Sequence, residues 1–264
     1  PFLFLFGGIL LPFLYFPPPF LHLGLLLVLA YPLRGEIGPY HSISVTQVID
    51  NCFLQPLAIK SSAPSRLKNG DKILEERPFA FGTDKDSLLE IEFLSKSSKG
   101  KFRLGRKSGL ELRPDYSLNL HRGSTLCTHK DFREWKIASS GCSVHIQGAG
   151  TWMLECLTAG LKFILLEGEM SINNSNKSQI MKSGDLVIIN TKSSQASKPI
   201  QVELPLLLGT SRLINGFSTP LPSKTRMISA AHVQALRLKR RYEAFVGDVS
   251  EEKKLQLWKL PQSP

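Results

Sequence analysis

The sequence predicts an all-β fold, an antiparallel β-sandwich or β-roll of many short strands, with an N-terminal hydrophobic segment and a C-terminal amphipathic helix. Three observations predict it. From His41 onward, apolar and polar residues alternate, as they do in strands with one wet face. Gly, Pro, Asn and Asp recur between these stretches at roughly the 8–12-residue spacing of sandwiches and barrels. Near the C terminus, apolar residues instead recur every three or four positions, which is the period of a helix.

The first 33 residues of the 264-residue chain contain no Asp, Glu, Lys or Arg. They form two apolar arms, Pro1–Phe16 and Phe20–Leu33, which three prolines separate. Each arm is shorter than the ~20 apolar residues of a membrane-spanning helix, and the second has the length and leucine content of a signal-peptide core. We expect export through the inner membrane to the periplasm or cell envelope. Residues 1–33 are then either a cleaved signal peptide or a retained membrane anchor, followed by a linker at 34–42.

The β-domain is expected to span residues 43–214. Alternation predicts strands in the following order: Ser42–Val48, Leu88–Leu94, Lys101–Leu104, Gly109–Leu112, Ser117–Leu120, Glu134–Ile137, Ser143–Gln147, Trp152–Leu157, Leu161–Leu166, Glu169–Asn173, Gln179–Met181 and Leu186–Asn190. Glycines mark the expected turns, among them Gly148–Gly150 and Gly168. A short apolar segment, Ile200–Leu208, continues the domain.

A Pro-containing linker at 215–226 precedes the predicted amphipathic helix at 227–246. The apolar positions of this helix step by four, three, four and three residues: Ala231, Ala235, Leu238, Tyr242 and Phe245. Its other faces carry several Lys and Arg. We expect residues 247–264 to form a polar tail.

Several of these strands resemble the core of the FecR-like domain family. The run Leu161–Glu169 followed by Met181–Ile188 is similar to that family's "vleG.v.v … l.aGe.v.v" pattern, and Leu89–Gly105 is similar to its "leL.f … vrLg" hairpin. The stretch Val144–Trp152 departs from the family's Thr-rich strand but keeps the Gly150-Thr151 step. The resemblance implies an all-β periplasmic domain with no catalytic residues to carry over. Members that regulate sigma factors have a cytoplasmic region ahead of their membrane segment. We identify no such region in this sequence, and we therefore do not expect the protein to regulate a sigma factor.

A cupin is the enzymatic alternative, because Leu166–Gly168 and Lys182–Asp185 also suit the second half of a cupin. A cupin metal site needs two His and a Glu from neighbouring strands. The sequence has no His-x-His, and no His lies between His145 and His232. We therefore expect no metal, no cofactor and no enzymatic activity.

The densest set of metal-binding side chains is His121, Cys127 and His129, with Cys142 and His145 nearby. Even spacing would place the first three on one face of a strand, but Gly123 is expected to interrupt that strand. We interpret these residues as surface histidines and a half-buried cysteine. Cys142 and His145 are separated by an odd number of positions, so they should point to opposite faces rather than form a nucleophile and base.

The four cysteines are Cys52, Cys127, Cys142 and Cys156, and export would permit disulfides. If two disulfides form, the four cysteines can pair in three alternative ways. If a single bond forms, the preferred pair is Cys142 with Cys156, across the expected turn at Gly148–Gly150. Buried thiols that act as small hydrophobic groups are the alternative.

The chain carries 33 Lys and Arg against 22 Asp and Glu, a net charge of +11. This positive charge could bind a nucleic acid, or it could bind an anionic lipid or envelope polymer, or it could contribute to solubility alone. An apolar leader argues against nucleic acid. We therefore expect a non-enzymatic, exported FecR-like protein that acts as a binding, scaffold or sensing module at the bacterial envelope. Its partner would be an envelope polymer, an anionic lipid or a protein, with membrane association through residues 1–33 if they are retained. The alternatives are a cupin-like metal-dependent enzyme and a basic nucleic-acid-binding protein.

Overall fold

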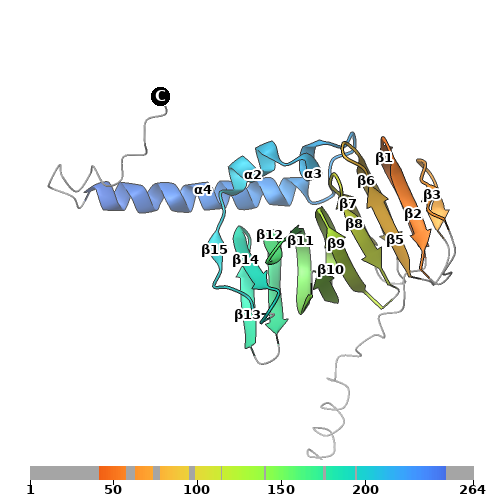
Figure 1. Ribbon diagram of the computed structural model, residues 1–264. Coiled ribbons are helices and arrows are strands. Elements are labelled where there is room, and N and C mark those ends of the chain that lie inside the picture. Colours follow the sequence, from red (N-terminus) through yellow and green to blue (C-terminus); the bar gives the residue numbers. More distant parts are fainter. Residues whose placement is uncertain are drawn as a thin grey trace, which may run out of the picture. The chain divides into compact units, whose positions relative to one another are not determined.

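The computed structural model describes residues 42–57, 63–73, 78–94, 99–113, 115–139, 141–174, 177–193 and 195–247, with the side chains of 174, 177 and 238–247 left aside. Strands dominate this part of the chain, which confirms the all-β prediction (Figure 1). The predicted export segment at 1–33 and the polar tail beyond Gly247 lie outside the described residues.

The strands are β1 (Ser42–Ile49), β2 (Cys52–Pro56), β3 (Ser65–Arg66), β4 (Lys72–Ile73), β5 (Phe79–Thr83), β6 (Leu88–Leu94), β7 (Lys99–Leu104), β8 (Gly109–Leu112), β9 (Ser117–Arg122), β10 (Ser124–Ser139), β11 (Cys142–Leu157), β12 (Gly160–Asn174), β13 (Lys177–Lys182), β14 (Asp185–Asn190) and β15 (Ile200–Gln201). The helices are α2 (Leu204–Thr210), α3 (Arg212–Asn215) and α4 (Lys224–Gly247).

Hydrogen bonds join these strands into one sheet that folds into two layers. The first layer runs β15-β14-β12-β11-β10-β7-β6-β1-β4, and the second runs β13-β12-β11-β10-β9-β8-β5-β2-β3. The long strands β10, β11 and β12 belong to both, because the first half of β10 pairs with β7 and its second half with β9. Among the pairs of described strands, only β9 with β10 is parallel.

Glycines bend the long strands from one layer to the other. Gly148, Gly150 and Gly168 have φ values of 145°, 152° and 103°, a region that only glycine enters readily. Gly150 lies directly opposite Gly168, and a Cβ atom at Gly150 would overlap the carbonyl oxygen of Glu167. The prediction of a turn at Gly148–Gly150 is therefore wrong. The chain bends there within β11, so two predicted short strands form one 16-residue strand.

The two layers enclose an apolar core in which aromatic rings pack edge to face. Trp135 lies at the centre, with ring centroids of Phe93, Phe102, Tyr116 and Trp152 between 5.4 and 5.9 Å away. Trp152 and Trp135 are fully buried. Such contacts stabilise the core beyond the burial of apolar area.

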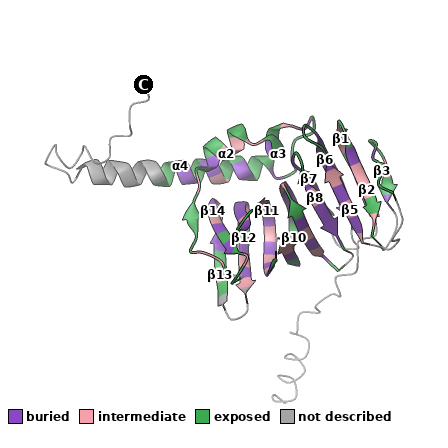
Figure 2. Ribbon diagram, viewed as in Figure 1, coloured by how far each residue is buried: buried purple, intermediate pink, exposed green. Residues whose placement is uncertain are grey.

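The helices cover the outer face of the first layer (Figure 1). Leu126, Ile164 and Leu166 of the sheet form a second apolar cluster with Met227 and Ala231 of α4, together with side chains from α2 and α3. Figure 2 shows the same division, with buried residues on the helix sides that meet the sheet and exposed residues on the sides that face away.

The buried stripe of α4 differs from the predicted one. Ala231 is buried as expected, but Ala235 is exposed, and the other members of the stripe are Met227 and Gln234. The remaining predicted positions of the stripe lie among side chains outside the description. A polar residue, Gln234, occupies the core-facing position because its amide makes hydrogen bonds that an apolar side chain could not make.

Candidate binding surface beside helix α4

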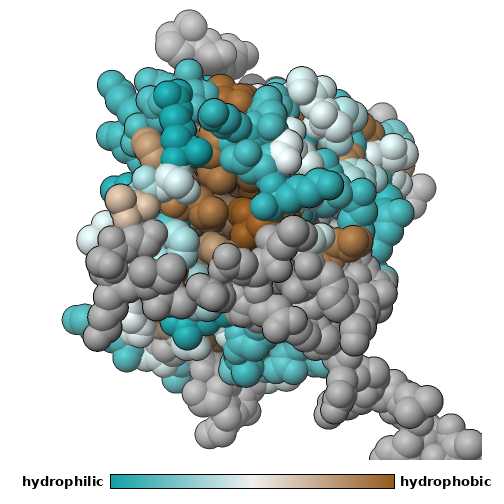
Figure 3. All heavy atoms as spheres, turned by 90° about the vertical axis from the view of Figure 1, so that its right-hand side faces the viewer, coloured by the Kyte–Doolittle hydropathy of each residue, from teal (hydrophilic) through white to brown (hydrophobic). Residues whose placement is uncertain are grey.

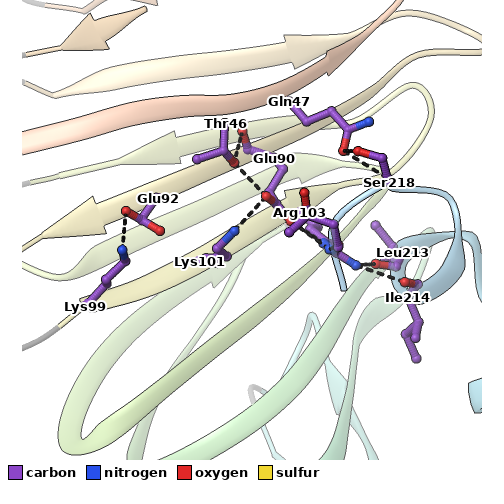
Figure 4. A network of polar contacts seen from close by, with 11 residues as sticks. Thr46, Gln47, Glu90, Glu92, Lys99, Lys101, Arg103, Leu213, Ile214 and Ser218 are labelled. Carbon is purple, nitrogen blue, oxygen red and sulfur yellow. Dashed lines mark hydrogen bonds and ion pairs between the residues drawn. The ribbon is translucent and has the colours of Figure 1, made fainter. Parts of the chain in front are cut away.

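An ionic ladder on β6 and β7 holds the chain between α3 and α4 against the sheet (Figure 4). Glu90 Oε1 accepts from Thr46 Oγ1 at 2.6 Å and from Lys101 Nζ at 2.8 Å, and Glu90 Oε2 accepts from Arg103 Nε at 2.7 Å. Burial by itself raises the pKa of Glu90, but these three donors outweigh it and hold that pKa below its ordinary value. Glu90 is therefore a buried carboxylate that stays ionised.

Arg103 connects this ladder to the helices. Its Nη1 donates to the carbonyl oxygens of Leu213 at 3.1 Å and Ile214 at 2.9 Å, and its Nη2 donates to that of Thr219. Its guanidinium carbon lies 4.3 Å from the ring centroid of Phe217. A cation that satisfies carbonyls at the end of α3 fixes the course of the chain into α4.

A buried hydroxyl network fixes the beginning of α4. The hydroxyl of Ser223 lies 3.2 Å from that of Thr128 and 2.7 Å from that of Thr151. Thr151 Oγ1 also lies 3.1 Å from Oε2 of Glu167. The other carboxylate oxygen of Glu167, Oε1, accepts a hydrogen bond of 2.6 Å from Nε of Arg226. The first turn of α4 is thereby attached to three neighbouring strands.

Gln234 fixes α4 about two turns further on. Its Oε1 accepts from the backbone N–H of Leu204 at 2.9 Å, an amide in the first turn of α2 that has no partner within its helix. Its Nε2 donates to the carbonyl of Val202 at 2.7 Å and to Gln201 Oε1 at 3.1 Å. Gln234 therefore joins α4 to α2 and to the end of β15.

A groove of about 930 Å³ runs between this anchored helix and the strands beside it. Arg226 and Arg237 line it from α4, and exposed Glu169 and Glu203 line it from the sheet side. Basic groups thus line the helix wall, whereas the sheet wall carries these two acidic groups together with Lys182. Such an arrangement suits a bound chain that itself carries both signs of charge.

A shallower hollow of about 540 Å³ lies on the opposite side of the molecule, at β2, β3 and β5. Figure 3 views this side and shows apolar surface gathered among hydrophilic residues. Phe53, Pro64 and Ala80 line the hollow together with Gly82 and Arg122. Its floor offers few polar groups, so the groove beside α4 is the stronger candidate for specific recognition.

The His and Cys residues that form the densest set of metal-binding side chains in the sequence do not converge in space. Among the described residues, no group of three or more His, Cys, Asp or Glu is placed to hold a metal ion. Gly123 does separate β9 from β10, as expected, with a φ of 76°. His121 is exposed beside Glu111, whereas Cys127 is fully buried in the core. The interpretation of Cys127 as half-buried is therefore wrong.

His129 is also a core residue rather than a surface one. Its Nδ1 donates to the carbonyl of Asp131 at 2.9 Å, which leaves Nε2 to accept from the indole N–H groups of Trp135 and Trp152 at 3.2 Å each. Burial lowers the pKa of His129 to about 4, so the ring is neutral at physiological pH. The even spacing of Cys127 and His129 places both side chains on the same face of β10, and that face is the buried one.

Cys142 and His145 point to opposite faces of β11, as predicted. Cys142 is buried and its Sγ donates to the carbonyl of Ser139, whereas His145 Nδ1 lies 2.9 Å from a carboxylate oxygen of Glu134 at the surface. Burial raises the pKa of the Cys142 thiol. This environment does not activate Cys142 as a nucleophile.

Cys142 and Cys156 lie near the two ends of β11. Because β11 bends at its glycines, both ends of the strand lie close to β9. The Cys156 thiol donates to the carbonyl of His121 at 3.6 Å, and Ser139, beside Cys142, donates to that of Leu120 at 2.6 Å. Both cysteines are thiols in the structure. Their pairing as a disulfide stays a prediction.

No pattern in the sequence indicates the groove residues as a group, because they come from α4 and from strands far away along the chain. The acidic and the basic residues of the groove each stand in ordinary stretches of sequence. They can be recognised as one candidate site only because the fold brings them to the same cavity. Among the described residues, none of the helices is both long enough and apolar enough to span a bilayer.

Neither a family model nor a curated protein sequence matches this chain. Two crystal structures of a candidate anti-sigma factor from Parabacteroides distasonis ATCC 8503 are similar to it, with TM-scores of 0.39 and 0.37 and 6% sequence identity in each case. The similarity covers 51% and 50% of this chain and 65% of that protein's chain. This chain therefore spans less than two thirds of the length of those structures.

Proposed function

We propose that this protein is a non-enzymatic, FecR-like binding, scaffold or sensing module of the bacterial envelope, which holds its partner in the groove beside α4. The observation that carries the proposal is the opposition of Arg226 and Arg237 to Glu169 and Glu203 across a preformed cavity. A partner with both carboxylate and ammonium groups, such as a protein segment or a peptide-bearing envelope polymer, would complement both walls.

Preorganisation supports binding at this groove. Ser223, Arg226 and Gln234 hold α4 in place through bonds that exist before any partner arrives. Binding therefore does not have to order the helix, and more of the contact free energy remains as affinity.

The charge-free segment at 1–33 supports export. Fractionation of the native host tests this part of the proposal. The chain should be recovered with the envelope or periplasm, and recovery of the intact chain in the cytosol would contradict export.

Site-specific photo-crosslinking tests the groove. A photoreactive residue in place of Lys182, which lines the groove, should give a discrete adduct with envelope fractions. The matched control is Ser178, an exposed residue on the same strand that does not line the groove. The adduct should disappear in Arg237→Glu. Identical adducts from both positions, or none from Lys182, would contradict the proposal.

A further inference from the structure

Positive charge is concentrated in the helical part of the chain. Between Leu204 and Tyr242 the sequence contains seven Lys or Arg and no Asp or Glu. The strand region, 42–203, contains 22 Lys or Arg against 17 Asp or Glu, and many of these form pairs such as Lys99 with Glu92. The net charge of the strand region, +5 (22 minus 17), is thus spread over about four times as many residues as the +7 carried between Leu204 and Tyr242.

The side of α4 that faces away from the sheet has an apolar centre. We call this surface the outer face of α4, and its members are Ile228, His232 and Leu236, which recur every four residues, with Lys224 one step before them in the same row. The exposed fractions of Ile228 and Leu236 are 54% and 44%. At about 100° per residue, Ile228, His232 and Leu236 point roughly 80–160° away from the direction of buried Met227 and Ala231.

An exposed apolar strip beside cations is the pattern of a helix that lies in a membrane interface. The apolar side chains enter the boundary between headgroups and acyl chains, and Lys or Arg at the edges meet the lipid phosphates. Duplex nucleic acid would use the cations but would leave Ile228 and Leu236 in water. A second copy of this chain would bring two surfaces of like charge together. Charge complementarity and the apolar centre together favour anionic lipid.

We propose that the outer face of α4 binds the surface of an anionic lipid bilayer, with the helix axis parallel to the membrane plane. Ile228 and Leu236 enter the interface, and Lys224 lies at the level of the phosphates. This inference does not depend on what occupies the groove, because none of Lys224, Ile228, His232 and Leu236 lines it.

Vesicle flotation tests the proposal on the full chain. Binding to vesicles of equal phosphatidylglycerol and phosphatidylcholine should be roughly tenfold stronger than to phosphatidylcholine alone, and the ratio should fall at high salt. Residues 1–33 carry no charge, so any contribution from them is the same for both vesicles. The ratio therefore reports the cations. A ratio near one would overturn the proposal.

Matched variants locate the surface. Ile228→Asp combined with Leu236→Asp should reduce binding to the anionic vesicles about tenfold, whereas Ile180→Asp, at a residue of β13 that is 62% exposed, should not. Lys224→Glu should weaken binding more than Lys192→Glu, at an exposed residue of the strand region. All five positions are exposed, and unchanged thermal melting confirms that each variant is folded.

Two results would contradict the assignment to lipid. One is equal loss of binding in the α4 variants and their controls. The other is tighter binding to a duplex oligonucleotide than to anionic vesicles, with no effect of the Ile228 and Leu236 changes. Failure of the membrane test leaves the Lys182 crosslink of the groove as a separate result, since Lys182 lies on β13 and not on the outer face of α4.

Discussion

The two faces of the first sheet layer are covered in different ways. The inner face is covered by the second layer and is apolar and aromatic, with Trp135 and Trp152 at its centre. The outer face is covered by helices, and its contacts are apolar at Leu126 and Ile164 but ionic at Glu90 and Arg103. The inner face therefore maintains the sandwich, whereas the outer face positions the helices that form the groove and the proposed membrane surface.

The largest effect is expected on the inner face. Trp152→Ala removes a fully buried ring that contacts Trp135, Phe102 and Phe163, and should lower the free energy of unfolding by about 4 kcal/mol. Urea denaturation measures the change. Leu236→Ala, at the outer face of α4, is the control and should change stability by less than about 0.5 kcal/mol. Similar losses in both variants would remove the distinction between the faces.

Arg103→Met should cost about 3 kcal/mol, because it leaves Glu90 as a buried carboxylate that has lost its closest charged partner. The loss should appear locally, as faster tryptic cleavage at Arg212 and Lys224, since Arg103 holds the carbonyls of Leu213 and Ile214. Adding Glu90→Gln should recover part of the stability. An additive loss in the double variant would mean that the two side chains do not act as a pair.

His129 is a buried polar residue on the inner face, and it should make stability depend on pH. The unfolded chain binds a proton at this residue near pH 6.5, whereas the folded protein does so only near pH 4. The unfolded state therefore holds more protons in this window. Lowering the pH from 7 to 5 should reduce the free energy of unfolding by about 2 kcal/mol.

Urea titrations at the two pH values test this effect. His129→Asn should flatten the dependence, and His121→Gln, at an exposed histidine, should leave it intact. An unchanged slope in the His129 variant would contradict the assignment.

The smallest of these effects concerns the bend that joins the layers. Gly150→Ala forces a side chain into a φ of 152° and against the Glu167 carbonyl, and should cost about 1.5 kcal/mol. Gly82→Ala is the matched control, since a Cβ atom there meets nothing within 4 Å. It should be close to neutral. Equal effects measured by thermal unfolding would show that the bend does not require glycine.

The sequence by itself determined the all-β class, since strand alternation is a local property of neighbouring residues. It also predicted the existence of α4, the interruption at Gly123 and the opposite orientations of Cys142 and His145. These features depend on the periods of two and 3.6 residues and on turn chemistry, which need no knowledge of distant contacts.

The tertiary structure alone decided which residues do more than their local pattern indicates. Gly150 bends a strand instead of ending it because Gly168 lies opposite. His129 is buried because two tryptophans donate to its ring. Arg103 anchors the helices through carbonyls more than 100 residues away. Each role depends on a partner distant in the sequence, and local periodicity carries no information about such partners.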